Sequence, residues 1–404
     1  MESPARPIGA HPWAMLAVSV YAQTSTTVVL VTPAFLIPLL HTVQGLSLVQ
    51  AGLLAAAPNL GMVLTLVAWG AAADRWGERR VLVLGLLVTV LAVVAAMVVQ
   101  GYVALGIALL VAGMGAASTN VASGRVVVGW FPRERRGLAM GIRQACQPLG
   151  TAIAALSVPP LVAAGSVLPA LILGGAMVFV ACAACAVVIV DPPRPERVRV
   201  EGTSDNPYRH GVLWRIHAVS VLLVVPQFAL STFGLVWMVV GLGFSALVAG
   251  IVVSAAQFLG AFGRVAVGIL SDRVGSRLRP LRWVALAGIV ALLATAATGA
   301  LGEGALGWAI AAAGCYVIAS CISVADNGLA FTSVAEVAGP FWSGRALGAQ
   351  NTGQFLGAAI VGPAVGALIG IAGYAGAFAL VAIAPLVAVP LVPSAATERR
   401  HTTV

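Results

Sequence analysis

The sequence predicts an all-α membrane protein of twelve transmembrane helices, arranged as two pseudo-symmetric bundles of six. Three observations lead to this fold class: an apolar composition, long uncharged runs that alternate with arginine-rich loops, and a pattern that occurs twice along the chain. Of the 404 residues, 60% are hydrophobic and only 9% are charged, whereas a soluble domain has about 25% charged residues. This composition excludes a soluble enzyme, a disordered chain and a nucleic-acid-binding protein.

Long runs without a charged residue define the expected helices. About 20 apolar residues are enough for a helix to cross a bilayer, and the runs together with their turns predict twelve such spans. The expected spans are 14–38, 48–71, 81–99, 102–124, 138–162, 168–190, 212–238, 247–270, 283–300, 305–333, 346–369 and 374–392.

The placement of the arginines predicts how the chain is oriented. All basic residues are arginine, and they cluster in every second loop, whereas the intervening turns carry none. Positively charged loops stay on the cytoplasmic side of a membrane. We therefore expect a multi-pass protein of the cytoplasmic (plasma) membrane with both termini in the cytoplasm. Tryptophans at the same ends, among them Trp76 and Trp130, favour the headgroup layer.

Two similar loops reveal an internal repeat. The second loop lies 198 residues after the first. The residues of the first loop are Gly70, Asp74, Arg75, Gly77, Arg79 and Arg80. Those of the second loop are Gly268, Asp272, Arg273, Gly275 and Arg277. A second stretch repeats at an offset of 207 residues, which makes Asn120 correspond to Asn327. The chain is therefore one duplicated six-helix unit, with an N-terminal bundle over 1–190, a cytoplasmic linker over 191–211 and a C-terminal bundle over 212–404.

The Gly-x-x-x-Asp-Arg-x-Gly-x-Arg-Arg pattern at 70–80, with its degenerate copy at 268–277, resembles the signature loop of the major facilitator superfamily of secondary transporters. Glu78 stands where that family usually has a basic residue. The resemblance covers the whole chain. It implies that the third, sixth, ninth and twelfth spans are peripheral and that the other eight surround a central cavity.

The chemistry of the two loops can be argued from their residues. Asp74 and Asp272 lie at the C-terminal ends of expected helices, where the helix dipole disfavours a carboxylate. Each aspartate therefore needs a partner, either an arginine or the N-terminus of another helix. Gly70 and Gly268 allow two helices to approach closely. We expect the loops to gate transport by holding one conformation and releasing it in another; the simpler interpretation is a topology signal.

Few ionisable residues lie within the expected spans, and each is a functional hypothesis because a charge in hydrocarbon is costly. Asp326 lies ten residues before Glu336, which places it roughly 15 Å deep in the membrane. It could bind a proton or contact the substrate, or it could form a structural pair with an arginine. Arg143 could bind a carboxylate or phosphate group of a substrate. Alternatively, it could form a salt bridge to Asp326 or to the carboxylates of the loops.

Two further arginines and several amides complete the candidate pathway. Arg125 either contacts the substrate or extends to the headgroup layer, and Arg264 is expected to stabilise the second loop. The uncharged candidates are Asn120, Asn327, Gln23, Thr27 and Gln227. Gln23 and Thr27 share one face of a helix.

Together these residues favour a secondary transporter that moves a small solute by alternating access. The intramembrane arginines favour an organic anion, and Asp326 favours the proton as coupling ion, in symport. The expected partners are the solute, the proton and the lipid bilayer, with no nucleic acid and no obligate protein partner. No catalytic residue, cofactor or metal site is expected, because the sequence shows no nucleophile–base pair, no ligand set and no P-loop.

Two other functions stay open. The first is proton-coupled efflux of drugs or metabolites by antiport; efflux members of the superfamily usually carry Gly-Pro-x-x-Gly-Gly in the fifth span, and the stretch at 147–151 departs from this pattern. The second is a transporter-like membrane sensor, for which the short linker and tails offer no signalling surface. The substrate, the direction of transport, the stoichiometry and the oligomeric state do not follow from the sequence.

Overall fold

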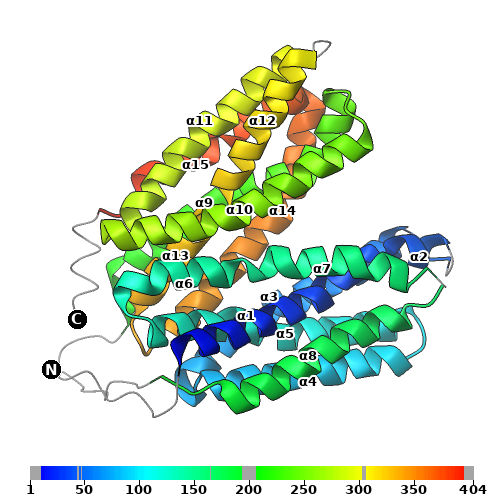
Figure 1. Cartoon of the computed structure of the whole chain (residues 1–404), viewed down its shortest axis with the longest axis vertical. Coiled ribbons are helices and arrows are strands. Elements are labelled where there is room, and N and C mark those ends of the chain that lie inside the picture. The colour runs from blue at the N-terminus through cyan, green and yellow to red at the C-terminus, as the bar shows by residue number, and fades with distance from the viewer. Residues whose placement is uncertain are drawn as a thin grey trace. The chain divides into compact units, whose positions relative to one another are not determined.

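The computed structural model describes residues 11–42, 45–46, 48–163, 165–192, 206–302 and 306–394. Within these residues every regular element is a helix, which confirms the all-α fold class (Figure 1). The predicted cytoplasmic termini and most of the predicted linker lie outside the described residues. Ten helical stretches in the described part of the chain are long and apolar enough to cross a membrane.

Two interruptions in the helices explain why ten stretches are found where twelve spans are predicted. The stretch Ser343–Leu391 contains Gly373, whose φ of 68° and ψ of 178° end one helix and begin the next. The spans predicted over 346–369 and 374–392 are therefore both present. The span predicted over 138–162 consists of two shorter helices, α6 (Arg133–Gln144) and α7 (Cys146–Leu161). Twelve spans result.

The described residues form two compact units that exchange short segments. Unit 1 comprises Met1–Phe131, Ala145–Thr203 and Ala338–Thr352, and unit 2 comprises Pro132–Gln144, Ser204–Val337 and Gly353–Val404. Each unit thus contains a segment from the other half of the sequence. The bundle boundaries predicted in chain order, 1–190 and 212–404, stay a prediction.

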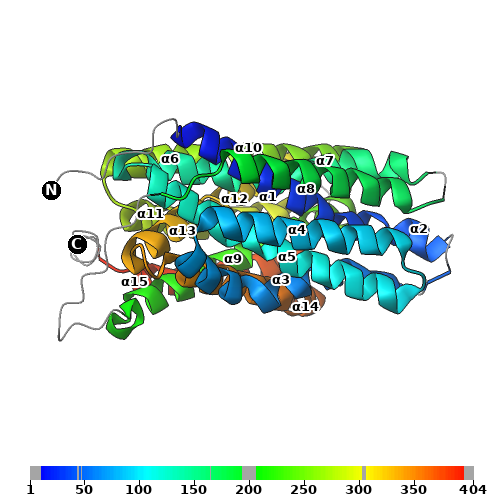
Figure 2. The same cartoon turned by 90° about the horizontal axis from the view of Figure 1, so that it is seen from below.

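Unit 1 is built around α5. Its helices are α1 (Pro12–Phe35), α2 (Ile37–Thr42), α3 (Leu48–Trp76), α4 (Glu78–Val98), α5 (Tyr102–Trp130), α7, α8 (Leu168–Val188) and the beginning of α14 (Ser343–Val381). α3 and α4 pack against α5, while α1 packs against α7 and α8. α4 and α8 run side by side, as Figure 2 also shows.

Unit 2 has an aromatic centre. Its helices are α6, the short turn η1 (Pro207–His210), α9 (Val212–Val236), the π-helical turn η2 (Trp237–Gly241), α10 (Ala246–Val274), α11 (Leu278–Gly302), α12 (Leu306–Ser323), α13 (Asp326–Ala338), the remainder of α14 and α15 (Ile383–Leu391). The ring of Trp237 lies edge-on to Phe378 at 5.0 Å and tilted to Tyr316 at 6.2 Å. α6 packs against α10, and α11 packs against α12.

Burial in both units is the reverse of that in a soluble protein. Large apolar side chains lie exposed on the outer faces, among them Leu91 (60%), Phe179 (62%) and Val290 (68%). Polar side chains such as Ser25 and Asn120 are buried instead. Hydrocarbon is the solvent of a spanning helix, so the outer face needs no polar groups and the inner faces can hold them.

Two helix breaks shape unit 2. α6 ends at Gln144, four residues before Pro148. Proline has no N–H group, so the carbonyl of Gln144 lacks the donor that a continuous helix would provide. The second break, at Val324–Ala325, separates α12 from α13 and places Asp326 at the first position of α13.

Candidate functional site

A buried cluster of charges lies at the end of α3 in unit 1. The Asp74 carboxylate accepts hydrogen bonds from the backbone N–H groups of Gly344 (2.8 Å) and Arg345 (3.0 Å), at the start of α14. Arg125 of α5 pairs with Asp74 and donates from Nε to Glu78 at 2.7 Å. The side chains of Asp74, Glu78 and Arg125 are at most 4% exposed. Asp74 therefore has both an arginine and a helix N-terminus as partners.

Arg125 extends this Asp74 cluster to the segment before α14. Its guanidinium donates to Ser343 Oγ at 2.7 Å and to the carbonyl of Pro340 at 3.3 Å. Removing one partner of a buried ion pair costs about 3–5 kcal/mol, because the other charge stays uncompensated. The cluster therefore ties α3 and α5 to the first turn of α14. Sequence reasoning treated Glu78 as a minor departure and missed that it is the second carboxylate beside Arg125.

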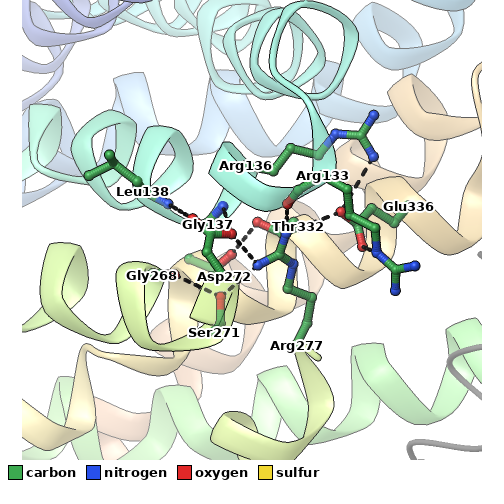
Figure 3. A network of polar contacts seen from close by, with 11 residues as sticks. Arg133, Arg136, Gly137, Leu138, Gly268, Ser271, Asp272, Arg277, Thr332 and Glu336 are labelled. Carbon is green, nitrogen blue, oxygen red and sulfur yellow. Dashed lines mark hydrogen bonds and ion pairs between the residues drawn. The ribbon is translucent and has the colours of Figure 1, made fainter. Parts of the chain in front are cut away.

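The second loop forms a corresponding cluster at the end of α10 in unit 2 (Figure 3). The Asp272 carboxylate accepts hydrogen bonds from the N–H groups of Gly137 and Leu138, both at 2.9 Å and one turn into α6. Arg277 donates from Nη1 to Asp272 at 2.5 Å and to Ser271 Oγ at 2.8 Å. Asp272 thus holds α6 as Asp74 holds α14.

Glu336 of α13 supplies the second carboxylate of this Asp272 cluster. Its Oε1 lies 3.4 Å from Nη1 of Arg136 and 3.5 Å from Nη2 of Arg277, as Figure 3 shows. Its Oε2 lies 3.9 Å from Nε of Arg133. Sequence reasoning used Glu336 only to mark the end of a span. Two features of the sequence could have indicated the role of Glu336. It is a single carboxylate at the end of an apolar helix, and the chain has an arginine-rich segment at 133–136.

Pairs of glycines bring the helices of each cluster into contact. A Cβ atom on Gly70 would lie 2.3 Å from the carbonyl oxygen of Gly344, and one on Gly268 would lie 2.2 Å from that of Gly137. Real Cβ atoms do not approach so closely, so any side chain at Gly70 or Gly268 would separate the helices. The aspartates can reach the backbone of α14 and α6 because these four positions lack side chains.

The other predicted gating residues lie outside these contacts. Four of the arginines are exposed: Arg75, Arg79, Arg80 and Arg273. Gly77 and Gly275 form the turns after α3 and α10 with φ of 96° and 66°, values that favour glycine.

Each unit also contains a pair of amides that is buried in unit 1 and partly buried in unit 2. In unit 1, Nε2 of Gln23 donates to Oδ1 of Asn120 at 3.0 Å, and Ser123 donates to Gln23 at 2.9 Å. In unit 2, Nδ2 of Asn327 donates to Gln227 at 3.0 Å. The first helix and the fourth span of each half thus meet through the same two residue types.

The neighbours of these amides differ between the units. Gln354, which sequence reasoning did not single out as a candidate, bridges Asn327 at 2.9 Å and Ser220 at 2.7 Å. Thr27 donates instead to the carbonyl of Gln23 at 2.8 Å, within its own helix. Thr27 thus satisfies its hydroxyl locally.

Arg264 of α10 links the two helix breaks of unit 2. Its Nη1 donates to the carbonyl of Gln144 at 2.7 Å, the carbonyl that Pro148 leaves without a helical donor. Its Nε donates to the carbonyl of Val324 at 3.3 Å, in the break between α12 and α13. A cation at the C-terminal end of a helix is favourable, and Arg264 serves two such ends while it is only 6% exposed.

Asp326 lies beside this arrangement and is 1% exposed. Neither of its carboxylate oxygens accepts a hydrogen bond from a side chain of the described residues, while the backbone N–H groups of Asp326 and Asn327, at the start of α13, act on the carboxyl group. Arg264 is the charged side chain that acts on it. A cavity of about 10 Å³, lined by Asp326, Ser323 and Pro226 among others, adjoins the carboxyl group. Such a space is about the size of one water molecule.

The other predicted arginines have separate surroundings. Arg143 is 1% exposed, donates to the side chain of Gln144 at 2.9 Å and lies 5.4 Å from the ring centre of Phe331. Arg125 lies in the Asp74 cluster rather than beside the amides of its unit. In the described part of the chain, no group of three His, Cys, Asp or Glu residues is arranged to hold a metal ion.

Comparison with known proteins agrees with this architecture. The family model of the Major Facilitator Superfamily matches residues 14–361. An uncharacterized MFS-type transporter of Mycobacterium tuberculosis is 45% identical over 392 residues, which cover 96% of this chain and 85% of that protein.

Solved structures share the fold at low sequence identity. The E. coli fucose:proton symporter FucP superimposes with a TM-score of 0.72 at 15% identity, over 96% of this chain and 98% of that one. The proton:xylose symporter XylE gives a TM-score of 0.74 at 13% identity, over 95% and 96% of the two chains. At such identities the similarity concerns the fold alone.

Proposed function

The chain belongs to the major facilitator superfamily and is a multi-pass membrane transporter, and from this premise we propose that it moves a small organic anion together with protons, by alternating access across the cytoplasmic membrane. The arginine-rich loops support a cytoplasmic location of both termini. The observation that carries the proposal is the carboxylate of Asp326, which is 1% exposed and accepts no hydrogen bond from a side chain of the described residues.

Asp326 has the properties of a proton site. An isolated carboxylate inside a membrane protein is costly when charged, and a neighbouring arginine offsets that cost. Arg264 supplies this charge, so both forms of Asp326 can exist in turn. The adjoining cavity, at about 10 Å³, is too small for an organic solute but not for a water molecule. These features favour proton binding over substrate binding at Asp326.

The amides and Arg143 are the proposed substrate contacts of unit 2. Gln227 and Asn327 offer donors and acceptors that can exchange one partner for a solute. Gln23 and Asn120 are the corresponding proposed contacts within unit 1. Arg143 is the proposed cation for an anionic solute, because it is a buried guanidinium of unit 2, beside Gln144 and the ring of Phe331.

A neutral polar solute is the second candidate, and the two amide pairs favour it. An amide both donates and accepts, as does a hydroxyl group, so paired amides suit a polyol or a sugar. FucP and XylE, which share the fold, are named for a fucose and a xylose.

The Asp74 and Asp272 clusters are the proposed gates. Each carboxylate holds the backbone of one helix, α14 or α6, that the sequence places in the other half of the chain. When the helix moves away from the carboxylate, the conformation that the cluster stabilises is lost. When the helix returns, that conformation forms again.

Transport in proteoliposomes tests the proposal. Purified protein is reconstituted with and without a pH gradient, and uptake of ¹⁴C-labelled small carboxylates is compared with that of pentoses and hexoses. We expect accumulation of a carboxylate only with the gradient, and loss of accumulation but not of counterflow in Asp326→Asn. The matched control is Glu134→Gln, an exposed carboxylate that makes no hydrogen bond or ion pair with a described residue. Accumulation that survives in Asp326→Asn refutes the coupling role.

The same assay distinguishes the candidates. Accumulation of a sugar that persists in Arg143→Gln supports the neutral solute and excludes the anion. A gradient that expels solute from the vesicles indicates antiport instead of symport.

A further inference from the structure

We propose that unit 1 carries a binding site for an anionic glycerophospholipid, in a groove between the start of α4, which carries two arginines, and the end of α8. The groove is a cavity of about 640 Å³ lined by Trp76, Arg79, Arg80, Val83, Leu84 and Ala186. This site is separate from the proposed transport pathway and does not depend on it.

The polar end of the groove contains two guanidinium groups. Arg79 is fixed in place, because Nη2 donates to the carbonyl of Ala186 at 2.5 Å, near the C-terminus of α8. A guanidinium has five N–H donors, so most of those of Arg79 stay available. Arg80 is exposed and makes no hydrogen bond or ion pair with any described residue. Two such groups match the oxygens of one phosphodiester.

The nearby carboxylates do not neutralise this pair. Glu78 is buried and paired with Arg125. Asp191 accepts the backbone N–H of Arg79 at 2.8 Å and lies over the Cα atom of Gly77. Its charge is therefore held at the turn between α3 and α4, and the two arginines leave the groove with a net positive charge.

The remaining walls of the groove are apolar and continue along the membrane-spanning helices. On α4, Leu84 (44% exposed), Leu87 (45%) and Leu91 (60%) follow one another at helical spacing on the outer face. On α8, Val187 is 81% exposed and Val180 is 53% exposed. A charged end followed by two parallel apolar faces matches an amphiphile, because acyl chains can lie along α4 and α8 while the phosphate meets the arginines.

Trp76 places this end in the headgroup layer. Its ring is 51% exposed beside the arginines, and indole rings favour the membrane–water interface. Basic pockets between spanning helices at the cytoplasmic surface are suited to anionic headgroups. A soluble phosphate would use the arginines alone and would gain nothing from the apolar walls, so the groove favours a lipid.

The second half of the chain repeats the loop but not the residues that line the groove. At the offset of 198 residues, Arg79 corresponds to Arg277, which is 3% exposed and engaged with Asp272. Arg80 corresponds to Leu278, which is 1% exposed, and Trp76 corresponds to Val274. The fold and the gating loop therefore do not require this combination of residues, which points to a function of its own.

Lipid binding by the full-length protein tests the proposal. Native mass spectrometry in detergent measures retention of phosphatidylglycerol and of phosphatidylcholine, and thermal unfolding measures the stabilisation that each lipid gives. We expect preference for phosphatidylglycerol and a loss of about 30-fold in its affinity in Arg79→Gln/Arg80→Gln, since each arginine at an anionic surface contributes a factor of about five. The matched control is Arg273→Gln/Arg279→Gln, two exposed arginines of the second loop, which should retain the lipid as the wild type does.

Three results would overturn the proposal. The first is equal loss of phosphatidylglycerol in both double variants, which would indicate a general charge effect. The second is equal stabilisation by phosphatidylcholine, and the third is equal stabilisation by inorganic phosphate or glycerol 3-phosphate, which would assign the site to a free anion. The single variant Arg80→Gln, at a side chain that makes no hydrogen bond or ion pair with a described residue, gives a second reading if the double variant is unstable. Its affinity for phosphatidylglycerol should fall about fivefold.

Discussion

Replacing Asp74 by asparagine removes one negative charge from the Asp74 cluster while it keeps the size of the side chain. The carboxylate accepts the N–H groups of Gly344 and Arg345 and pairs with Arg125. The amide of asparagine has one acceptor oxygen, so its NH₂ group would face one of these donors. One backbone hydrogen bond and one ion pair are lost, while Glu78 continues to pair with Arg125.

The magnitude follows from these contacts. A hydrogen bond to a charged group contributes about 1.5–3 kcal/mol, and breaking a buried pair costs about 3–5 kcal/mol. Because Glu78 remains, we take the lower end and expect the state with α14 docked on α3 to lose about 3 kcal/mol. This change lowers its population relative to the released state by roughly 100-fold.

Cysteine labelling measures this population. Ala346, one turn into α14, is fully buried, and it is replaced by cysteine in a background without the five native cysteines. We expect maleimide to label this cysteine slowly in the parent and much faster with Asp74→Asn. Glu134→Gln makes the same charge change at an exposed side chain of α6 and should leave the rate unchanged. An unaltered labelling rate in Asp74→Asn refutes the role of Asp74 in holding α14.

Two further changes test the close contacts in each unit. Gly344→Ala places a Cβ atom 2.3 Å from the carbonyl oxygen of Gly70 and should lower stability in detergent by about 1–3 kcal/mol, whereas Gly307→Ala, with nothing within 4 Å, should not; equal melting temperatures of the two variants would contradict the contact. Arg264→Leu leaves two buried carbonyl groups without their donor, and each should lower the free energy of unfolding by about 1–3 kcal/mol. An unchanged thermal unfolding curve would show that the helix breaks do not need the arginine.

Much of the fold follows from the sequence because it depends on periodic and compositional signals. Uncharged runs and arginine clusters predict the spans, and the structure differs mainly where a span is broken. The break between α6 and α7 leaves a trace in the sequence at Pro148. The break at Val324–Ala325 has no proline or glycine within it, so it could not be read from local residues.

The candidate site was predictable in residue type but not in pairing. The need of Asp74 and Asp272 for a partner, either an arginine or a helix N-terminus, follows from their place at a helix end. Which arginine serves which carboxylate depends on tertiary packing: Arg125 lies with Asp74, and Arg264 acts on Asp326. No spacing along the chain determines these pairs, since they join different spans.

The pH of sealed proteoliposomes during solute entry tests the central claim most directly. A pH-sensitive dye is enclosed, and solute is added outside without an imposed gradient. If solute and proton move together through Asp326, the interior should acidify as the solute enters, and Asp326→Asn should abolish the signal while solute still exchanges across the membrane. Solute entry without a pH change in the wild-type protein would contradict the account.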